Sequence, residues 1–446
     1  MTLAGPEQAQ PIRETKDEIA ALFDTLWPLF RSITGDGVRQ SLDVLSAQLP
    51  LTQIEVPTGT PVFDWIVPKE WVVREAHLTG PDGRRIADIR DNNLHLVNYA
   101  VPFRGRMDRA ELDRHLHSRP DQPDAIPYVT SYYSPAWGFC LPHRVRAALP
   151  DGDYDVVIDT NHVDGSLTLG EAVLPGESDE EVLFSTYVCH PSMANNELSG
   201  PLVAAFLYRR LAQIENRRLT YRFVFLPETI GSLAYLSLRG DHLKRRLLAG
   251  YILTCIGDSG PFTYKRSRHA ASLANRAAEY ALKRQGAADS RVLDFSPIGS
   301  DERQYCSLGF DLPVGSLMRT PYGQFPEYHT SLDNRSFIDF DAIGASVDMA
   351  LGICRILEDA ETFVTLVREG EPNLGRRGLY PAQGGNRKAG EGVAAILWAL
   401  HFSDGQTDLL SIAERSGVPL EDLADMARRC AAAGIMARGA PKGHGT

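Results

Sequence analysis

The sequence has few of the features that mark membrane or disulfide-bonded proteins. No apolar run approaches the roughly 18 residues that a membrane-spanning helix needs. The first residues carry neither the basic nor the apolar segment of a signal peptide. The six cysteines lie far apart and form no CxxC pair, which argues against a disulfide framework or a cysteine zinc site. We therefore expect a cytoplasmic protein that does not contact a membrane.

Positive charge is also scarce. The 446 residues include 46 Lys and Arg against 57 Asp and Glu, which gives a net charge of −11. A chain with this balance lacks the basic surface on which nucleic-acid binding depends, so we expect no nucleic-acid partner. Hydrophobic residues make up 43% of the chain, as in ordinary globular proteins. The length predicts about two to four domains.

The pattern of apolar and polar residues changes along the chain and predicts several domains. A capping-box pattern at Thr15 and Glu18, followed by apolar residues at helical spacing, predicts helices within residues 14–50. Short alternating apolar runs between Gly- and Asp-containing turns predict a β-rich unit from about 51 to 175. The predicted segments are an N-terminal part of the main domain (1–55), an inserted β-rich domain (56–165), the main α/β domain (166–370), a linker (371–390) and a winged-helix-like domain (391–440).

Strands and helices alternate between residue 181 and about residue 360. This alternation predicts an α/β fold with a doubly wound sheet, and the apolar strands predict that both faces of the sheet are covered. The predicted strands are 181–188, 220–226, 249–256 and 313–318, and the predicted helices are 199–214, 230–239, 269–285 and 338–358.

Two further clusters have ordinary explanations. The aromatic group in the β-rich unit, which includes Tyr128, Tyr132 and Tyr133, is attributed to packing. The helical runs after residue 390 have helix-turn-helix form, but the would-be recognition helix opens with Glu421 and Asp422, where DNA phosphates would require cations. We expect this unit to bind a protein partner or a second copy of the chain.

Polar residues directly follow the predicted strands. His190, Glu228 and Asp258 follow the first three strands, and His329 lies in the loop after the fourth. Ligands of open α/β sheets bind at the carboxyl ends of the strands. Histidine nitrogens and carboxylate oxygens suit zinc, which lowers the pKa of a bound water toward about 7. Glu228, between a strand and a helix, is the best candidate for a general base.

Several motifs resemble those of the co-catalytic zinc aminopeptidases, a superfamily that also contains the glutaminyl cyclases. The run CHPSMANNELSG resembles its histidine and DNASG region, and PETIGSLAYL resembles its catalytic-glutamate segment. CIGDSG, GSDERQYC and EYHTSLDN resemble its metal-binding aspartate, its SDH-type loop and its final histidine. The phrases VPKEW, DNNLHLVNY and WGFCLPH resemble, in order, a bacterial aminopeptidase-like group with an inserted β-domain and a C-terminal winged helix.

The resemblance implies a phosphorylase/hydrolase-like α/β sandwich around a mixed central sheet. It implies that His190, Asp258 and His329 are metal ligands and that Asn196 occupies the place of the aspartate that bridges two zinc ions. It also implies that Glu228 is the general base. Arg303, in the SDH-type loop, is expected to bind a substrate carboxylate; an ordinary ion pair is the alternative.

Three positions depart from the family pattern. Asn196 cannot supply a bridging negative charge, Thr229 stands where a second metal-binding glutamate is expected, and Ser192 replaces the aspartate that orients the first histidine. The bacterial group has Asn-Asp-Asn where this chain has Asn195, Asn196 and Glu197. Two zinc ions about 3.5–4 Å apart repel each other strongly without an anionic bridge. We therefore expect at most one zinc ion, held by His190, Asp258 and His329, with Glu197 as a substitute source of charge; without that substitution, weak or no metal binding is the alternative.

Three functions remain open at this point. The leading one is a zinc-dependent hydrolase that acts on an amide bond of a small amino-acid-containing molecule or peptide. The second is an enzyme that forms or cyclises an amide at a one-zinc site, as glutaminyl cyclases do. The third is a metal-free binding or scaffold protein.

Overall fold

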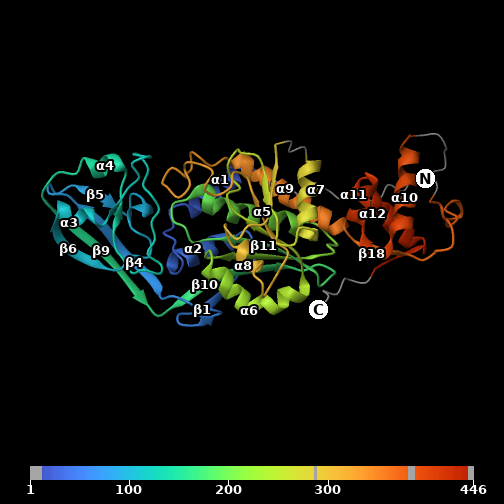
Figure 1. Cartoon of the computed structure of the whole chain (residues 1–446), viewed down its shortest axis with the longest axis horizontal. Coiled ribbons are helices and arrows are strands. Elements are labelled where there is room, and N and C mark those ends of the chain that lie inside the picture. The colour runs from blue at the N-terminus through green and yellow to red at the C-terminus, as the bar shows by residue number, and fades with distance from the viewer. Residues whose placement is uncertain (1–12, 286–288, 380–386, 440–446) are drawn as a thin grey trace.

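The computed structural model describes residues 13–285, 289–379 and 387–439. A β-rich unit, a central α/β unit and a helical C-terminal unit follow one another along the long axis of the molecule (Figure 1). The α/β fold with a mixed sheet, a β-rich insertion and a C-terminal helix-turn-helix unit is thus confirmed. Among the described residues, none of the helices combines the length and apolar character that a membrane span needs.

The central sheet has the strand order β1-β10-β12-β11-β13-β16-β14-β15. The four middle strands, from β12 to β16, run parallel. β10 pairs antiparallel with β1 and β12, and β14 pairs antiparallel with β16 but parallel with β15, so the sheet is mixed. The middle strands lie where the apolar runs predicted them. The bounds are β1 (Thr52–Pro57), β10 (Ser166–Leu174), β11 (Glu181–Tyr187), β12 (Thr220–Leu226), β13 (Leu247–Leu253), β14 (Thr263–Lys265), β15 (Arg291–Leu293) and β16 (Val314–Met318).

Helices cover both faces of this sheet. Residues of α1, α5, α7 and α9 form one hydrophobic core with Phe184 of β11, whereas α6 packs in a second core with Leu183, whose side chain points to the other face. The bounds are α1 (Lys16–Leu26), α2 (Asp36–Leu45), η2 (Ala194–Leu198, a π-helical turn), α5 (Ser199–Ala212), α6 (Ile230–Arg246), α7 (Leu273–Arg284), α8 (Glu302–Tyr305) and α9 (Phe340–Asp359).

The β-rich unit leaves the α/β unit after β1 and rejoins it at β10. Its main sheet has the order β5-β4-β9-β6, and a short hairpin, β2–β3, lies between β1 and β4. The bounds are β2 (Pro61–Val62), β3 (Trp65–Ile66), β4 (Glu70–Thr79), β5 (Arg85–Asp88), η1 (Asn93–His95), β6 (Phe103–Asp108), α3 (Arg109–Asp113), β7 (Leu116–His117), β8 (Phe139–Cys140), α4 (His143–Ala147) and β9 (Asp153–Val163).

The C-terminal unit begins before the predicted linker at 371–390. Its sheet has the order β18-β17-β19, and β17 precedes the linker, so residues on both sides of the linker belong to this unit. Residues 380–386 of the linker, and residue 440 at the end of the predicted domain, lie outside the described residues. The bounds are β17 (Thr362–Thr365), η3 (Gly375–Arg377), α10 (Arg387–Phe402), β18 (Asp404–Asp408), α11 (Leu409–Ser416), α12 (Leu420–Ala432) and β19 (Met436–Arg438).

Candidate active site

Three of the predicted site residues meet at the carboxyl edge of the central sheet. His190 follows β11, Glu228 follows β12, and His329 lies in the loop between β16 and α9. The Nε2 atom of His190 is 3.7 Å from Oε2 of Glu228. The rings of His190 and His329 are 5.5 Å apart between centroids. The sheet therefore brings two imidazoles and one carboxylate together.

Glu197 is hydrogen-bonded to Nδ1, the second ring nitrogen of His190. Its Oε2 atom is 2.6 Å from Nδ1, and its side chain is fully buried. Burial alone would lower the pKa of His190, but Cys189 and Glu197 beside the ring raise this pKa well above its ordinary value. Because Nδ1 is engaged, Nε2 is the nitrogen that can face a substrate, or a metal ion that would displace the Nε2 proton. Glu197 thus provides the orienting carboxylate that Ser192 lacks.

A buried arginine lies behind Glu197. Nε of Arg31 is 4.0 Å from Oε1 of Glu197, and the guanidinium also donates hydrogen bonds to the backbone carbonyls of Leu26 and His190. Its side chain is fully buried. The positive charge of Arg31 therefore lies behind the buried Glu197 carboxylate, whose other oxygen faces Nδ1 of His190.

Cys189, His190 and Glu197 offer ligand atoms within 4.8 Å of one another, the one such group among the described residues. However, both Sγ of Cys189 and the Glu197 carboxylate contact Nδ1, at 3.4 Å and 2.6 Å. Burial raises the pKa of the Cys189 thiol to about 11, so this thiol is neutral near pH 7 and is a poor metal ligand. We therefore interpret this group as the support of His190.

Asp258 has no free carboxylate oxygen. Oδ1 accepts hydrogen bonds from the Gly260 backbone N–H and the Thr320 hydroxyl, both at 2.7 Å. Oδ2 accepts from Nδ2 of Asn195 at 2.8 Å and from the Thr320 backbone N–H at 3.2 Å. A carboxylate has about four acceptor positions, and these bonds fill them. As a metal ligand, Asp258 would have to release some of these bonds.

Asn196 lies in a buried, sulfur-rich environment. Its Nδ2 atom is 3.7 Å from Sδ of Met193, and its Oδ1 atom accepts from the Cys255 thiol at 3.7 Å. Sulfur atoms are weak hydrogen-bonding partners. A neutral amide fits here, whereas a carboxylate would need a nearby cation.

Glu228 has the properties of a general base. Oε1 accepts a hydrogen bond from Ser300 at 3.2 Å. Burial raises the pKa of Glu228 above its ordinary value, although the neighbouring His190 opposes this shift. Arg303 lies close enough to Glu228 to stabilise its charged form. Nε of Arg303 is buried without a hydrogen-bond partner in the described part of the chain.

Thr229, the next residue, has a left-handed backbone with φ of +65°. Its N–H donates to Oδ1 of Asp301 at 2.7 Å, and its hydroxyl accepts from Arg303 at 3.2 Å. A β-branched residue in this region is strained, and such strain is typical of functional sites. Asp301 was not among the predicted site residues, although it lies in the same SDH-type motif as Arg303. Burial and the nearby Glu228 raise its pKa.

These contacts decide how many metal ions the residues fit. His329 is a suitable ligand because burial lowers its pKa to about 3, so its ring is neutral. Nε2 of His190 and a ring nitrogen of His329 fit one ion. Positions 196 and 229 carry no acid, and both oxygens of Asp258 accept hydrogen bonds, so these three positions offer no free carboxylate for a second ion. The ligand roles of His190, Asn196, Asp258 and His329 stay predictions.

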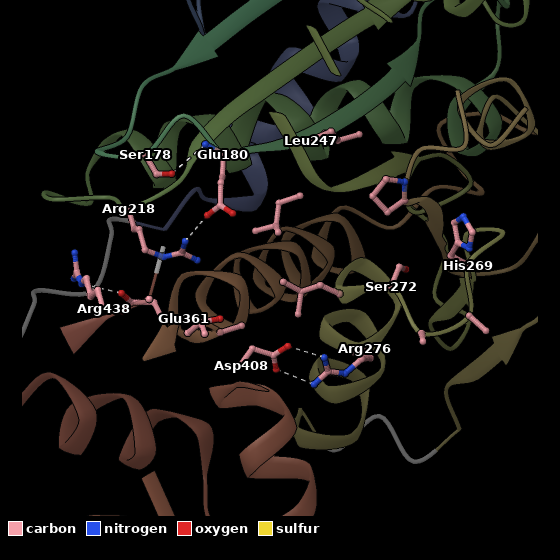
Figure 2. A pocket seen from close by; sticks show the side chains of 18 of the residues that line it. Ser178, Glu180, Arg218, Leu247, His269, Ser272, Arg276, Glu361, Asp408 and Arg438 are labelled. Carbon is pink, nitrogen blue, oxygen red and sulfur yellow. Dashed lines mark hydrogen bonds and ion pairs between the residues drawn. The ribbon is translucent and has the colours of Figure 1, made fainter. Parts of the chain in front are cut away.

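A large cavity lies at the opposite edge of the sheet. It has a volume of about 920 Å³ and is lined by residues at the amino ends of the strands, such as Glu180, Leu247 and Pro313. Figure 2 shows its arginines paired with acids, Arg218 with Glu180 and Arg276 with Asp408. Because these charges are neutralised within the protein, we place the chemistry at the carboxyl edge and not in this cavity.

Comparisons with known proteins agree with this architecture. Residues 20–360 match a family described as a domain of unknown function, DUF4910, and residues 361–438 match a winged helix-turn-helix family. A candidate polysaccharide biosynthesis protein with an aminopeptidase-like domain, from Clostridium acetobutylicum, is 43% identical over 405 residues, which are 91% of this chain and 92% of the relative.

Solved structures extend the comparison. The crystal structure of a candidate peptidase from Clostridium acetobutylicum is 40% identical, with a TM-score of 0.86, over 95% of this chain and 96% of its own. A zinc aminopeptidase from Bacillus subtilis is 12% identical, with a TM-score of 0.54, over 75% of this chain and 93% of its own, and shares the fold. The predicted aminopeptidase-like fold is confirmed, and the chain belongs to the DUF4910 family, with a winged helix-turn-helix unit at its C-terminus.

Proposed function

We propose that this protein is a hydrolase that uses one zinc ion to cleave an amide bond of a small amino-acid-containing substrate. One observation carries the proposal: half-buried Glu228 faces Nε2 of His190 at the carboxyl edge of an aminopeptidase-like sheet. The Clostridium relative named for polysaccharide biosynthesis supports a substrate in which the amide is attached to a sugar.

Each residue has a defined part in this proposal. Glu228 takes a proton from the attacking water and returns it to the leaving amine, and its raised pKa brings it closer to the pH at which such transfers are efficient. Arg303, beside Glu228, binds a carboxylate of the substrate. His190 and His329 hold the zinc ion, and Asp258 joins them only if its bonds to Thr320 open. Bound zinc would polarise the scissile carbonyl and acidify a water.

The proposal is tested with Glu228→Gln. We expect this variant to keep its zinc and to lose roughly two to four orders of magnitude in turnover, because it keeps its shape but cannot accept a proton. The matched control is Glu358→Gln, since burial also raises the pKa of Glu358 but this residue bonds Tyr221, away from the site.

The assay combines elemental analysis with mass spectrometry of aminoacyl amides and aminoacyl amino sugars. Two products whose combined mass equals that of the substrate plus one water indicate hydrolysis. A single product that is lighter than the substrate by one water or one ammonia indicates cyclisation. Loss of zinc from the Glu228 variant would show that Glu228 is a ligand and not the base.

We also infer that the C-terminal unit is a fixed extension that binds a protein partner or a second copy of the chain, and that it does not read DNA. Its would-be recognition helix, α12, is tied to the α/β unit, because Glu421 pairs with Arg284 and Arg428 pairs with Asp359. Light scattering tests for self-association, and a gel-shift assay that found DNA binding would contradict the inference.

A further inference from the structure

Aromatic rings lead in a continuous series from His190 to the protein surface. The rings of His190 and Tyr128 are 5.2 Å apart, and the Tyr128 hydroxyl is hydrogen-bonded to that of Tyr132. The ring of Tyr132 lies 6.3 Å from that of Tyr133, which in turn lies 5.2 Å from Trp65. The aromatic cluster attributed above to packing therefore starts at the candidate active site and ends in solvent.

The inner end of this series is fastened to the candidate active site. The Tyr128 backbone N–H donates to the His329 carbonyl at 2.9 Å. Pro127 forms a β-bridge with Thr330, and the Ile126 N–H donates to the Ser331 hydroxyl. The β-rich unit thus places its aromatic rings at a fixed position relative to His329.

The outer end is exposed. Tyr133 is 59% exposed, Trp65 is 36% exposed, and Phe63 and Ile66 of the same hairpin are 55% and 65% exposed. In the described part of the chain, neither the Trp65 indole N–H nor the Tyr133 hydroxyl has a hydrogen-bond partner. A cluster of exposed apolar side chains next to a candidate active site marks a binding surface.

We propose that Trp65 and Tyr133 form an outer subsite that stacks a neutral sugar ring of the substrate. A sugar ring offers apolar C–H faces to aromatic rings, and its hydroxyls can bond the free indole N–H and phenol. Asp64, at the tip of the hairpin, disfavours an anionic group. An apolar peptide side chain would instead bind best in an enclosed pocket, whereas Trp65 and Tyr133 are exposed. This subsite rests on the proposed function, because it binds the sugar part of the molecule that is cut beside Glu228.

The subsite is tested by binding, independently of catalysis. The probe is N,N′-diacetylchitobiose, a neutral disaccharide, titrated into the full-length protein by calorimetry. We expect binding that weakens about fivefold to tenfold in Trp65→Ala and in Tyr133→Ala, as the loss of one stacking contact predicts. Trp65→Phe keeps a ring and should retain most of the affinity. The control is Leu366→Ala, since Leu366 is 53% exposed but belongs to the C-terminal unit.

Three results would overturn the subsite: no binding of the disaccharide to the natural protein, unchanged affinity in both alanine variants, or binding of a phenylalanine dipeptide in place of the disaccharide. Glu228→Gln separates this inference from the proposed function, because it should bind the disaccharide with unchanged affinity. If sugar binding depends on Trp65 but Glu228→Gln does not slow hydrolysis, the subsite stands and the proposed function fails.

Discussion

Replacing Glu197 by Gln tests whether this residue orients His190. The carboxylate accepts the Nδ1 proton over 2.6 Å. A glutamine would present either its oxygen or its NH₂ group to this nitrogen. Arg31, 4.0 Å away, attracts the amide oxygen and so favours the NH₂ group toward His190. His190 would then carry its proton on Nε2, the nitrogen proposed to bind zinc. Loss of such a supporting carboxylate typically lowers metal affinity about 10-fold to 100-fold, or about 1.4–2.7 kcal/mol.

The measurement is zinc affinity by competition with a chelator, together with thermal unfolding to confirm the fold. Glu181→Gln is a matched control, because Glu181 is also buried and contacts both a histidine, His242, and an arginine, Arg222, but lies at the amino end of β11. Adding Ser192→Asp to the Glu197 variant should recover part of the affinity, since φ of +48° at this position suits Asp better than Ser. Equal zinc affinity in the natural and Glu197→Gln proteins would refute the reasoning.

Three further predictions follow from the same contacts. Asn196→Asp should raise zinc affinity and make thermal stability more dependent on zinc, since the new carboxylate has only sulfur partners. Unchanged zinc content and affinity would show that position 196 does not face the ion. Asp301 has a pKa above its unfolded value of 3.8, so the folded state binds the extra proton and stability falls as pH rises above about 4. Asp301→Asn should flatten this fall between pH 5 and 8 in denaturant unfolding, and an unchanged slope would contradict it. Arg276→Ala removes two hydrogen bonds to Asp408 and should speed backbone hydrogen exchange in α11 but not in α1. Equal exchange rates in α11 of the variant and the natural protein would show that other contacts hold the C-terminal unit.

The sequence predicted the central fold well because its signals are local. The runs at 220–226 and 181–188 are mostly apolar, and the structure places β12 and β11 there. β17 was missed because Thr362–Thr365 is short and pairs with strands about forty and seventy residues further along the chain. No local pattern predicts such a pairing, so the residues of β17 were assigned to the main α/β domain (166–370) instead of the C-terminal unit.

The site was predicted unevenly, for a related reason. Residue type and position after a strand indicated His190 and Glu228, which the structure brings together. The same reasoning indicated Asp258, but its carboxylate is occupied by Asn195 and Thr320. Neither partner follows from the motif around Asp258, and only the folded chain shows that these oxygens are already bonded.

The segment 195–197 shows how a small change in sequence alters the chemistry of the site. The bacterial group has its acid in the middle of this triplet, whereas this chain has Asn196 there and an acid one residue later. The π-helical turn η2 places Asn196 among sulfur atoms and Glu197 against Nδ1 of His190. The negative charge therefore lies one residue later than the position that the resemblance assigns to the bridge, and it contacts Nδ1 of His190. In the proposed one-zinc site, this shift removes a ligand for a second ion and also replaces the carboxylate that Ser192 lacks, so the residues at 192, 196 and 197 would together favour a single ion.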